Sequence, residues 1–229
     1  MTHLVLASRS PQRRAILEQL GVAFTVVVSD ADELLTGDDP VALAVENARR
    51  KAQAVWRAGP DDSGRAHTGL AAGARASSSP PARSAAAADT DVPTSPPSMP
   101  VVGVDTVVVL DGVIYGKPAG FAEARATLSR LSGRAHEVVS GLAVVEDGEV
   151  RTASATTRVT FRDVDRATLD WYLATEEWRE RAGGYAIQGR GAALVAGIEG
   201  DYLNVVGLPV TALLDLLPGI LQSGVQHDS

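Results

Sequence analysis

The segment Val101–Leu110 constrains the fold most, because it places one carboxylate inside an otherwise apolar run of residues. Its sequence is VVGVDTVVVL, and a run of valines bounded by turn residues predicts a β-strand that is covered on both faces. The carboxylate belongs to Asp105. Burial of an ionised carboxylate is unfavourable unless a cation or hydrogen bonds compensate, so we expect Asp105 to have a partner.

A tight turn supplies one candidate for that partner. Asp111-Gly112 suits a two-residue hairpin, which would fold Val113–Tyr115 back along the strand and bring Lys117 toward Asp105. An acid and a base at one end of a sheet would suit catalysis, but carboxylates within strands also form purely structural ion pairs. The hairpin alone leaves both interpretations open.

Composition excludes several classes of protein and site. The chain has 229 residues, and its formal net charge of -7 argues against a surface that binds nucleic acid backbones. It contains no cysteine, and its four histidines lack the spacing of metal ligands, so any metal should be held by oxygen atoms. The N-terminus has no secretory signal and no apolar run is long enough to span a membrane, so we expect a soluble cytoplasmic protein.

The N-terminal residues predict an anion-binding loop between a strand and a helix. A short apolar strand, Leu4–Ala7, leads into the sequence SRSP, whose proline suits the first position of a helix ending near Gly21. Free backbone N–H groups, the positive end of the helix dipole and three nearby arginines would favour a phosphate or a carboxylate. The alternative is an ordinary capped helix with solvated arginines.

The next strand and helix provide acidic and basic side chains. Phe24–Val28 is a predicted strand that leads into an acidic turn, where Glu33 or Asp32 could bind Mg²⁺ together with substrate phosphates. Such acidic clusters are more often solvated loops. A helix should begin near Pro40 and bury a stripe of small apolar side chains. Lys51 flanks this stripe, from which its charge can reach solvent or a pocket.

The segment 57–100 differs from the rest of the chain. It contains seven of the twelve prolines, runs of alanine and serine, and no aromatic residue. Little in it can offset the entropy lost on ordering, so we predict a single domain over residues 1–229, interrupted by a disordered insertion at 57–100. A segment that folds on contact with a partner is the alternative.

The C-terminal half continues an α/β pattern. Its glycine-rich piece AGGYAIQGRG would allow close approach of the backbone to a ligand, and its Gln188 can both donate and accept hydrogen bonds to a base edge. His136 is expected to be a hydrogen-bonded structural residue. The predicted elements are a helix over Phe121–Leu131, paired strands Glu137–Val145 and Val150–Phe161, a helix capped by Asp165, a hairpin of Ala192–Ile198 with Tyr202–Val206, and a terminal helix Pro209–Leu217.

The chain resembles the Maf family of nucleoside triphosphate pyrophosphatases over nearly everything outside 57–100. The resemblance is closer to the branch that hydrolyses dTTP and UTP, because Gln188 stands where the branch acting on 7-methyl-GTP typically has glutamate. It implies a twisted mixed sheet flanked by helices, with two lobes around a central cleft, as in the inosine triphosphatase-like fold. The segments that carry it are, in order, LASRSPQRRAILEQLG, NARRKA, GVDTVVVLDGVIYGKP, LSGRAHEVVSGLAVV, AGGYAIQGRGAALV and VVGLPV.

The resemblance also implies roles for individual residues. Catalysis would depend on Asp105, Lys51 and Lys117, and a Mg²⁺ or Mn²⁺ ion would be held by Glu33 and Asp105. Gln12 departs from the pattern, because the pyrimidine-specific branch often has arginine there, which leaves the base preference open. The substrate-binding positions are Ser8, Ser10 and Arg13 of the phosphate loop, the neighbouring Gln12, the specificity residue Thr106 and the base-selecting Gln188.

The implied reaction is hydrolysis of dTTP, UTP and modified pyrimidine nucleotides between the α and β phosphates. Arg13, Lys51 and Lys117 would neutralise phosphate charge, while Asp105 would orient or deprotonate the attacking water, or hold the metal. Two alternatives remain at this point, a nucleotide-binding regulator of septum formation and a 7-methyl-GTP pyrophosphatase. The resemblance suggests a homodimer, with neither nucleic acid nor membrane as a partner.

Overall fold

A mixed β-sheet forms the centre of the structure, a computed structural model that describes residues 3–59 and 99–223. Its strands are β1 (His3–Leu6), β2 (Ala23–Val26), β3 (Val101–Leu110), β4 (Val113–Tyr115), β5 (Ala135–Glu146), β6 (Glu149–Phe161) and β7 (Val195–Glu199). They form one seven-stranded sheet in the order β2-β1-β3-β5-β6-β7, and β4 pairs with the end of β3. β1 runs parallel to β2 and β3, and the other pairs are antiparallel.

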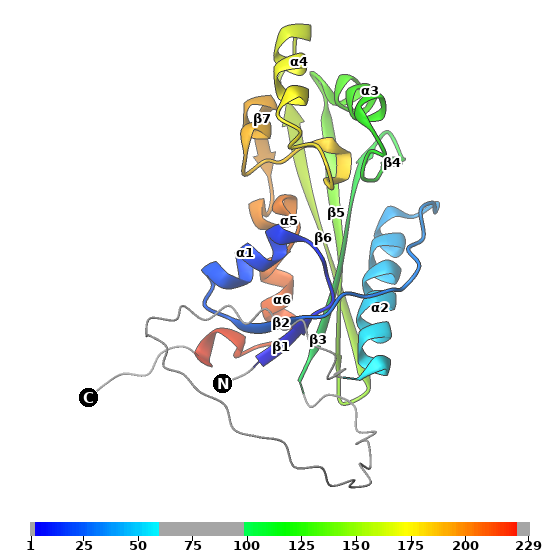
Figure 1. Ribbon diagram of the computed structural model, residues 1–229, viewed down its shortest axis with the longest axis vertical. Coiled ribbons are helices and arrows are strands. Elements are labelled where there is room, and N and C mark those ends of the chain that lie inside the picture. Colours follow the sequence, from blue (N-terminus) through cyan, green and yellow to red (C-terminus); the bar gives the residue numbers. More distant parts are fainter. Residues whose placement is uncertain (1–2, 60–98, 224–229) are drawn as a thin grey trace, which may run out of the picture.

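Helices cover both faces of this sheet. They are α1 (Pro11–Gln19), α2 (Pro40–Ala58), α3 (Phe121–Leu131), α4 (Arg166–Ala174), α5 (Tyr202–Val206) and α6 (Val210–Leu216). α2 lies along one face, α1, α5 and α6 lie on the other, and α3 and α4 pack together at one end of the long strands (Figure 1). The predicted α/β class, a twisted mixed sheet flanked by helices, is confirmed. Within the described ranges, no helix combines the length and apolarity needed to cross a bilayer.

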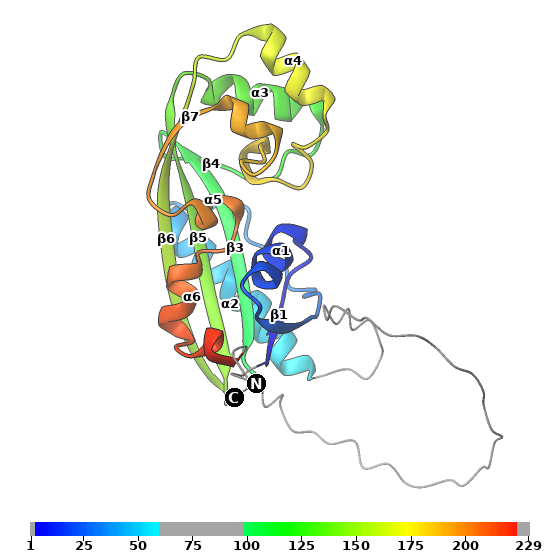
Figure 2. The same ribbon diagram turned by 90° about the vertical axis from the view of Figure 1, so that its left-hand side faces the viewer.

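Two apolar cores at opposite ends of the long strands divide the molecule into lobes (Figure 2). The first lobe contains β1, β2, α1 and α6, and its core includes Val102 and Val104 from the beginning of β3. The second lobe contains α3, α4, β7 and residues 182–194, and its core includes Val108 and Leu110 from the end of β3. β3 and β5 contribute to both cores, so they connect the two lobes directly.

The backbone of α2 packs directly against the backbone of the sheet at two glycines. A Cβ atom placed on Gly103 of β3 would overlap the carbonyl oxygen of Ala48, and one on Gly141 of β5 would overlap the backbone at Ala44. The contact face of α2 is lined by small residues such as Ala52, which is fully buried. This close packing sets the distance between α2 and β3, and so the starting position of any side chain that the helix projects toward β3.

In the part of the chain that the structure describes, the middle of β3 has no neighbouring strand on one side. β1 pairs with β3 at Val101 and Val102, and β4 pairs with it from Val108 to Leu110. Among the described residues, 103–107 therefore form an open edge on this side. Side chains alternate along a strand, so Asp105 faces α2 and Thr106 faces α1, yet both can be reached from the open edge.

Most predicted elements are present, with ends shifted by up to three residues, including the hairpin over Asp111-Gly112. One prediction was wrong: Tyr202–Val206 is not a strand but the helix α5, and β7 pairs with β6 instead. The side chain of Asp201 caps this helix by accepting from the Leu203 N–H at 2.8 Å. A five-residue apolar run has too few positions for its periodicity to separate a strand from a helix.

The bounds predicted for the insertion, 57 and 100, lie within the folded part of the chain at both ends. Arg57 belongs to α2, and the carbonyl of Pro100 accepts a hydrogen bond from the Val5 N–H at 2.9 Å. Residues 60–98 of that segment lie outside the described residues. Its disorder, and with it the single interrupted domain, stay predictions.

Candidate active site

A cavity of about 740 Å³ lies beside the open edge of β3 and is lined by residues of both lobes. The first lobe contributes the loop before α1, and the second lobe contributes the chain around Tyr185. Every site residue that the family resemblance implied lines this cavity, whereas Asp32, the alternative to Glu33, does not. The implied residues are Ser8, Ser10, Gln12, Arg13, Glu33, Lys51, Asp105, Thr106, Lys117 and Gln188.

The loop before α1 is fixed by its own hydroxyl groups. Ser10 caps the helix, because its Oγ accepts from the Arg13 N–H at 3.5 Å, and it donates to Gln12 Oε1 at 3.0 Å. The Oγ of Ser8 accepts from the Ser10 N–H at 3.2 Å. The loop therefore presents the N-terminal end of a nine-residue helix to the cavity, where the helix dipole favours an anion.

The side chain of Arg13 extends from α1 and forms hydrogen bonds with β3 and with the residue that ends α5. Its Nε donates to the Gly207 carbonyl at 2.8 Å, and its two terminal nitrogens donate to Ser8 Oγ at 3.0 Å and Thr106 Oγ1 at 3.1 Å. These partners are neutral, so they orient the guanidinium without compensating its charge. Burial lowers the pKa of Arg13, while the negative charges of Asp105 and Glu33 oppose that shift. An arriving anion would relieve the unfavourable burial of this charge.

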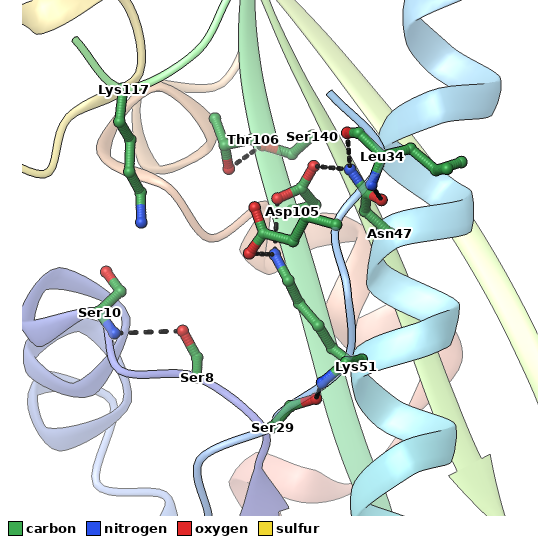
Figure 3. A network of polar contacts seen from close by, with 12 residues as sticks. Ser8, Ser10, Ser29, Leu34, Asn47, Lys51, Asp105, Thr106, Lys117 and Ser140 are labelled. Atoms are coloured by element: carbon green, nitrogen blue, oxygen red, sulfur yellow. Dashed lines mark hydrogen bonds and ion pairs between the residues drawn. The ribbon is translucent and has the colours of Figure 1, made fainter. Parts of the chain in front are cut away.

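Asp105 sits at the open edge of β3 with only 7% of its surface exposed. Its Oδ1 accepts from Lys51 Nζ at 2.7 Å, and its Oδ2 accepts from Asn47 Nδ2 at 3.0 Å (Figure 3). Both partners come from α2, whose position is set by the close packing at Gly103 and Gly141. The expected partner of Asp105 is therefore present, but it is Lys51 and not Lys117.

The acidic loop after β2 is attached to the same cluster. Glu33 Oε1 lies 2.8 Å from Lys51 Nζ, so this ammonium contacts two carboxylates. Asn47 holds the backbone of Leu34 by two hydrogen bonds, accepting from its N–H at 2.7 Å and donating to its carbonyl at 2.9 Å. Sequence reasoning missed Asn47. Its position four residues before Lys51 on one predicted helix was the available signal, because residues at that spacing share a face.

Lys117 reaches the cavity from the second lobe. In Figure 3 its side chain points into the space above Ser10, across from Asp105. Its Nζ lies 3.2 Å from Glu180 Oε2, in an ion pair whose two side chains are 58% and 78% exposed. The segments that carry Lys117 and Glu180 are joined at Gly183, whose N–H donates to the Gly116 carbonyl at 3.0 Å. A Cβ there would overlap Val108, and its φ of 66° also favours glycine.

Gln188 occupies an exposed turn at the second-lobe side of the cavity and makes no hydrogen bond to the described part of the chain. The turn itself is held by Glu177, whose Oε2 accepts from the Arg190 N–H at 2.7 Å. Beneath it, buried His136 bonds through Nε2 to the Tyr185 hydroxyl at 2.9 Å. Burial lowers the pKa of His136 to about 4, and the hydrogen bond expected of this residue is present.

Glu33 and Asp105 are the residues that could hold a divalent metal. Their oxygens converge on a single ammonium nitrogen, at 2.8 Å and 2.7 Å, which shows that the two carboxylates can share one cation. Among the residues that the structure describes, no group of three or more histidine, cysteine, aspartate or glutamate side chains is arranged to bind a metal. Two carboxylates completed by substrate phosphates and water are the donor set that Mg²⁺ commonly uses.

Comparisons with known proteins agree with this geometry. Residues 3–220 match the family described as Maf-like protein. A dTTP/UTP pyrophosphatase of Moorella thermoacetica is 41% identical over 220 residues, which cover 95% of this chain and 94% of that protein. A dTTP/UTP pyrophosphatase of Symbiobacterium thermophilum is 38% identical over 218 residues, covering 95% and 93%. One of Pyrococcus abyssi is 36% identical over 216 residues, covering 93% and 94%. The family resemblance seen in the sequence is confirmed.

Proposed function

The chain belongs to the Maf family, and from this premise we propose that it hydrolyses dTTP and UTP to the nucleoside monophosphate and pyrophosphate. The observation that carries the proposal is the buried Asp105, held by Lys51 and Asn47 within a cavity that also presents Arg13 and a helix N-terminus. A carboxylate beside clustered cations suits the activation of water next to a polyphosphate.

Phosphate binding is assigned to the loop before α1 and to the cations around it. Arg13 retains an uncompensated charge, and the N-terminus of α1 adds backbone donors, so a triphosphate would be neutralised there. Lys117 would approach the phosphates from the second lobe after leaving Glu180. These contacts would be strongest when negative charge accumulates on the leaving pyrophosphate, which lowers the barrier to cleavage.

Asp105 would act as the general base or orient the attacking water. Lys51 and Asn47 each bond one of its oxygens, so the plane of the carboxylate is fixed relative to the cavity. Each of these oxygens can accept a further hydrogen bond, because a carboxylate oxygen carries two lone pairs. Fixed geometry matters because proton transfer to a base requires the water to lie within hydrogen-bonding distance.

A divalent metal, Mg²⁺ or Mn²⁺, would be held by Glu33 and Asp105 together with the substrate phosphates. When bound, such an ion polarises a phosphoryl oxygen and offsets charge in the transition state. Binding would require Lys51 to yield part of its contact with the two carboxylates and to turn toward the phosphates. The homodimer and the cytoplasmic location stay predictions.

The nucleobase would lie near Gln188, whose amide has no competing partner in the described structure and can donate and accept simultaneously. A pyrimidine presents a carbonyl oxygen and a ring N–H on one edge, which one amide can read. Thr106 Oγ1 accepts a hydrogen bond from Arg13 at 3.1 Å and forms another with Ser140 Oγ at 2.9 Å. Thr106 would therefore affect substrate binding by orienting Arg13, which would contact the phosphates. The side chain of Gln12 accepts a hydrogen bond from the Ser10 hydroxyl.

The test is pyrophosphate release from a panel of nucleotides with Mg²⁺, with Mn²⁺ and with a chelator. We expect turnover of dTTP and UTP, and Asp105→Asn should reduce it by roughly 10²- to 10⁴-fold, because the amide cannot accept a proton. Asp111→Asn is the matched control, since Asp111 lies in the exposed hairpin turn and pairs with Arg134. Binding without release would favour the regulator, and turnover of 7-methyl-GTP alone would favour the other branch.

A further inference from the structure

The cations that line the cavity differ in how their charges are compensated. Five cationic side chains from the described residues line it, and three of these form ion pairs: Lys51 with Asp105 and Glu33, Lys117 with Glu180, and Arg9 with Asp30 at 4.0 Å. Within the described residues, the remaining two, Arg13 and Arg181, have no carboxylate within ion-pair distance. These two therefore carry the positive charge that a ligand can neutralise without first displacing an acidic side chain.

The Arg181 side chain makes fewer hydrogen bonds to the described residues than the Arg13 side chain does. Its Nε is buried and has no hydrogen-bond partner in the described structure. One terminal nitrogen makes a single long contact of 3.4 Å to the neighbouring Glu180 carbonyl. Burial lowers the pKa of Arg181, while the nearby charges of Glu177 and Glu180 act in the opposite direction. Buried donors without acceptors are unfavourable, and an anionic ligand would supply the acceptors that the Arg181 guanidinium lacks.

The position of Arg181 also suits this role. It stands at the start of the turn that includes Gly183, and Gly183 is bonded to the backbone beside Lys117. Arg181 and Lys117 therefore reach the cavity together from the second lobe, whereas Arg13 reaches it from the first. We propose that Arg181 binds the phosphate chain of the substrate, as the second-lobe counterpart of Arg13. This inference rests on the proposed function, since it requires a nucleotide in the cavity.

The chemistry favours phosphate over the base or the sugar. The planar guanidinium matches two phosphate oxygens with two parallel N–H donors, and hydrogen bonds between charged groups are roughly twice as strong as neutral ones. Sugar hydroxyls and pyrimidine carbonyls are neutral, so they would leave the Arg181 charge uncompensated. A polyphosphate supplies charge to both lobes at once and would hold them against each other around the substrate.

Binding measurements on the full chain test the proposal without depending on turnover. The probes are α,β-imido-dTTP, which cannot be cleaved between those phosphates, and inorganic pyrophosphate, each titrated in a calorimeter. Arg181→Gln should weaken both by about tenfold or more, the usual effect of losing one charged hydrogen-bonding group. Arg179→Gln is the matched control: Arg179 lies two residues away, stacks on Trp178 and pairs with Glu176, and we expect its affinities within twofold of wild type.

The outcomes separate this inference from the function on which it rests. Wild-type affinities retained by a folded Arg181→Gln protein would overturn the inference and leave the proposed function standing. A wild-type protein that binds neither probe would overturn the proposed function itself. If Arg181→Gln melts below the assay temperature, Arg181→Lys replaces it. The lysine keeps the charge but not the paired donors, so affinity should fall by about threefold or more, and an unchanged affinity would overturn the inference.

Discussion

Replacement of Asn47 by alanine tests how the candidate base is held in place. Asn47 is 2% exposed and makes three hydrogen bonds, one to Asp105 and two to the backbone of Leu34. Alanine keeps the helix α2 intact, because it has the highest helix propensity, and removes all three bonds. The change therefore releases Asp105 on one side and the loop that carries Glu33 on the other.

The expected magnitude follows from what replaces each bond. The two hydrogen bonds to the Leu34 backbone are only partly buried, so water can replace them once the amide is gone. The bond to Asp105 is buried and involves a charged group, and such a bond contributes about 1.5–3 kcal/mol. We expect the free energy of unfolding to fall by about 2–4 kcal/mol. Since a displacement of 1 Å can reduce a rate about 100-fold, kcat/KM should fall by roughly 10- to 100-fold.

Two measurements on the same protein check this reasoning. Urea denaturation gives the free energy of unfolding, and pyrophosphate release from dTTP gives kcat/KM. Gln53→Ala is the control on the same helix, because Gln53 accepts from Arg49 at 2.7 Å and has no bond to Asp105. We expect that control to change stability by less than about 0.5 kcal/mol. An Asn47→Ala protein that loses stability but keeps kcat/KM near that of the control would refute a positioning role.

Two further predictions concern charge. Glu180→Gln should lower KM for dTTP on the order of twofold by freeing Lys117 from an exposed and therefore weak ion pair, whereas Glu176→Gln should not; a raised KM would show that Glu180 assists binding. His136 has its pKa lowered from 6.5 to about 4, so the unfolded chain takes up a proton first as pH falls. The contribution of His136 to stability should be fully present above pH 6.5 and fall by about 3 kcal/mol toward pH 4, so urea denaturation of His136→Phe should show a pH dependence smaller by that amount.

The sequence predicted the cavity better than it predicted the contacts inside it. An acid within a valine-rich strand required a partner on energetic grounds, and the structure has one. The hairpin suggested Lys117, because turn geometry is a local signal. The observed partner, Lys51, is 54 residues away in the chain, and its position depends on the close packing of α2 on Gly103 and Gly141. That packing is a tertiary property that no local pattern contains.

Asn47 and α5 were missed for related reasons. A buried asparagine is detectable only through its partners, and those of Asn47 come from β3 and from the loop after β2. The helix α5 is defined by its cap at Asp201 and by its end at Gly207, whose carbonyl orients Arg13. The sequence element VVGLPV belonged to the family resemblance, yet its connection to Arg13 spans 194 residues. Long-range contacts of this kind arise only from the complete fold.

The two cores along β3 have a consequence for how such a protein can change its preference for a base. Gln188 depends on the core of α3 and α4, whereas Ser8 and Arg13 depend on the core of α1 and α6. Mutations can therefore remodel the turn around Gln188 through many neutral steps while the phosphate loop before α1 stays intact. Evolution can diversify the nucleotides accepted by this scaffold without rebuilding the machinery that would cleave them.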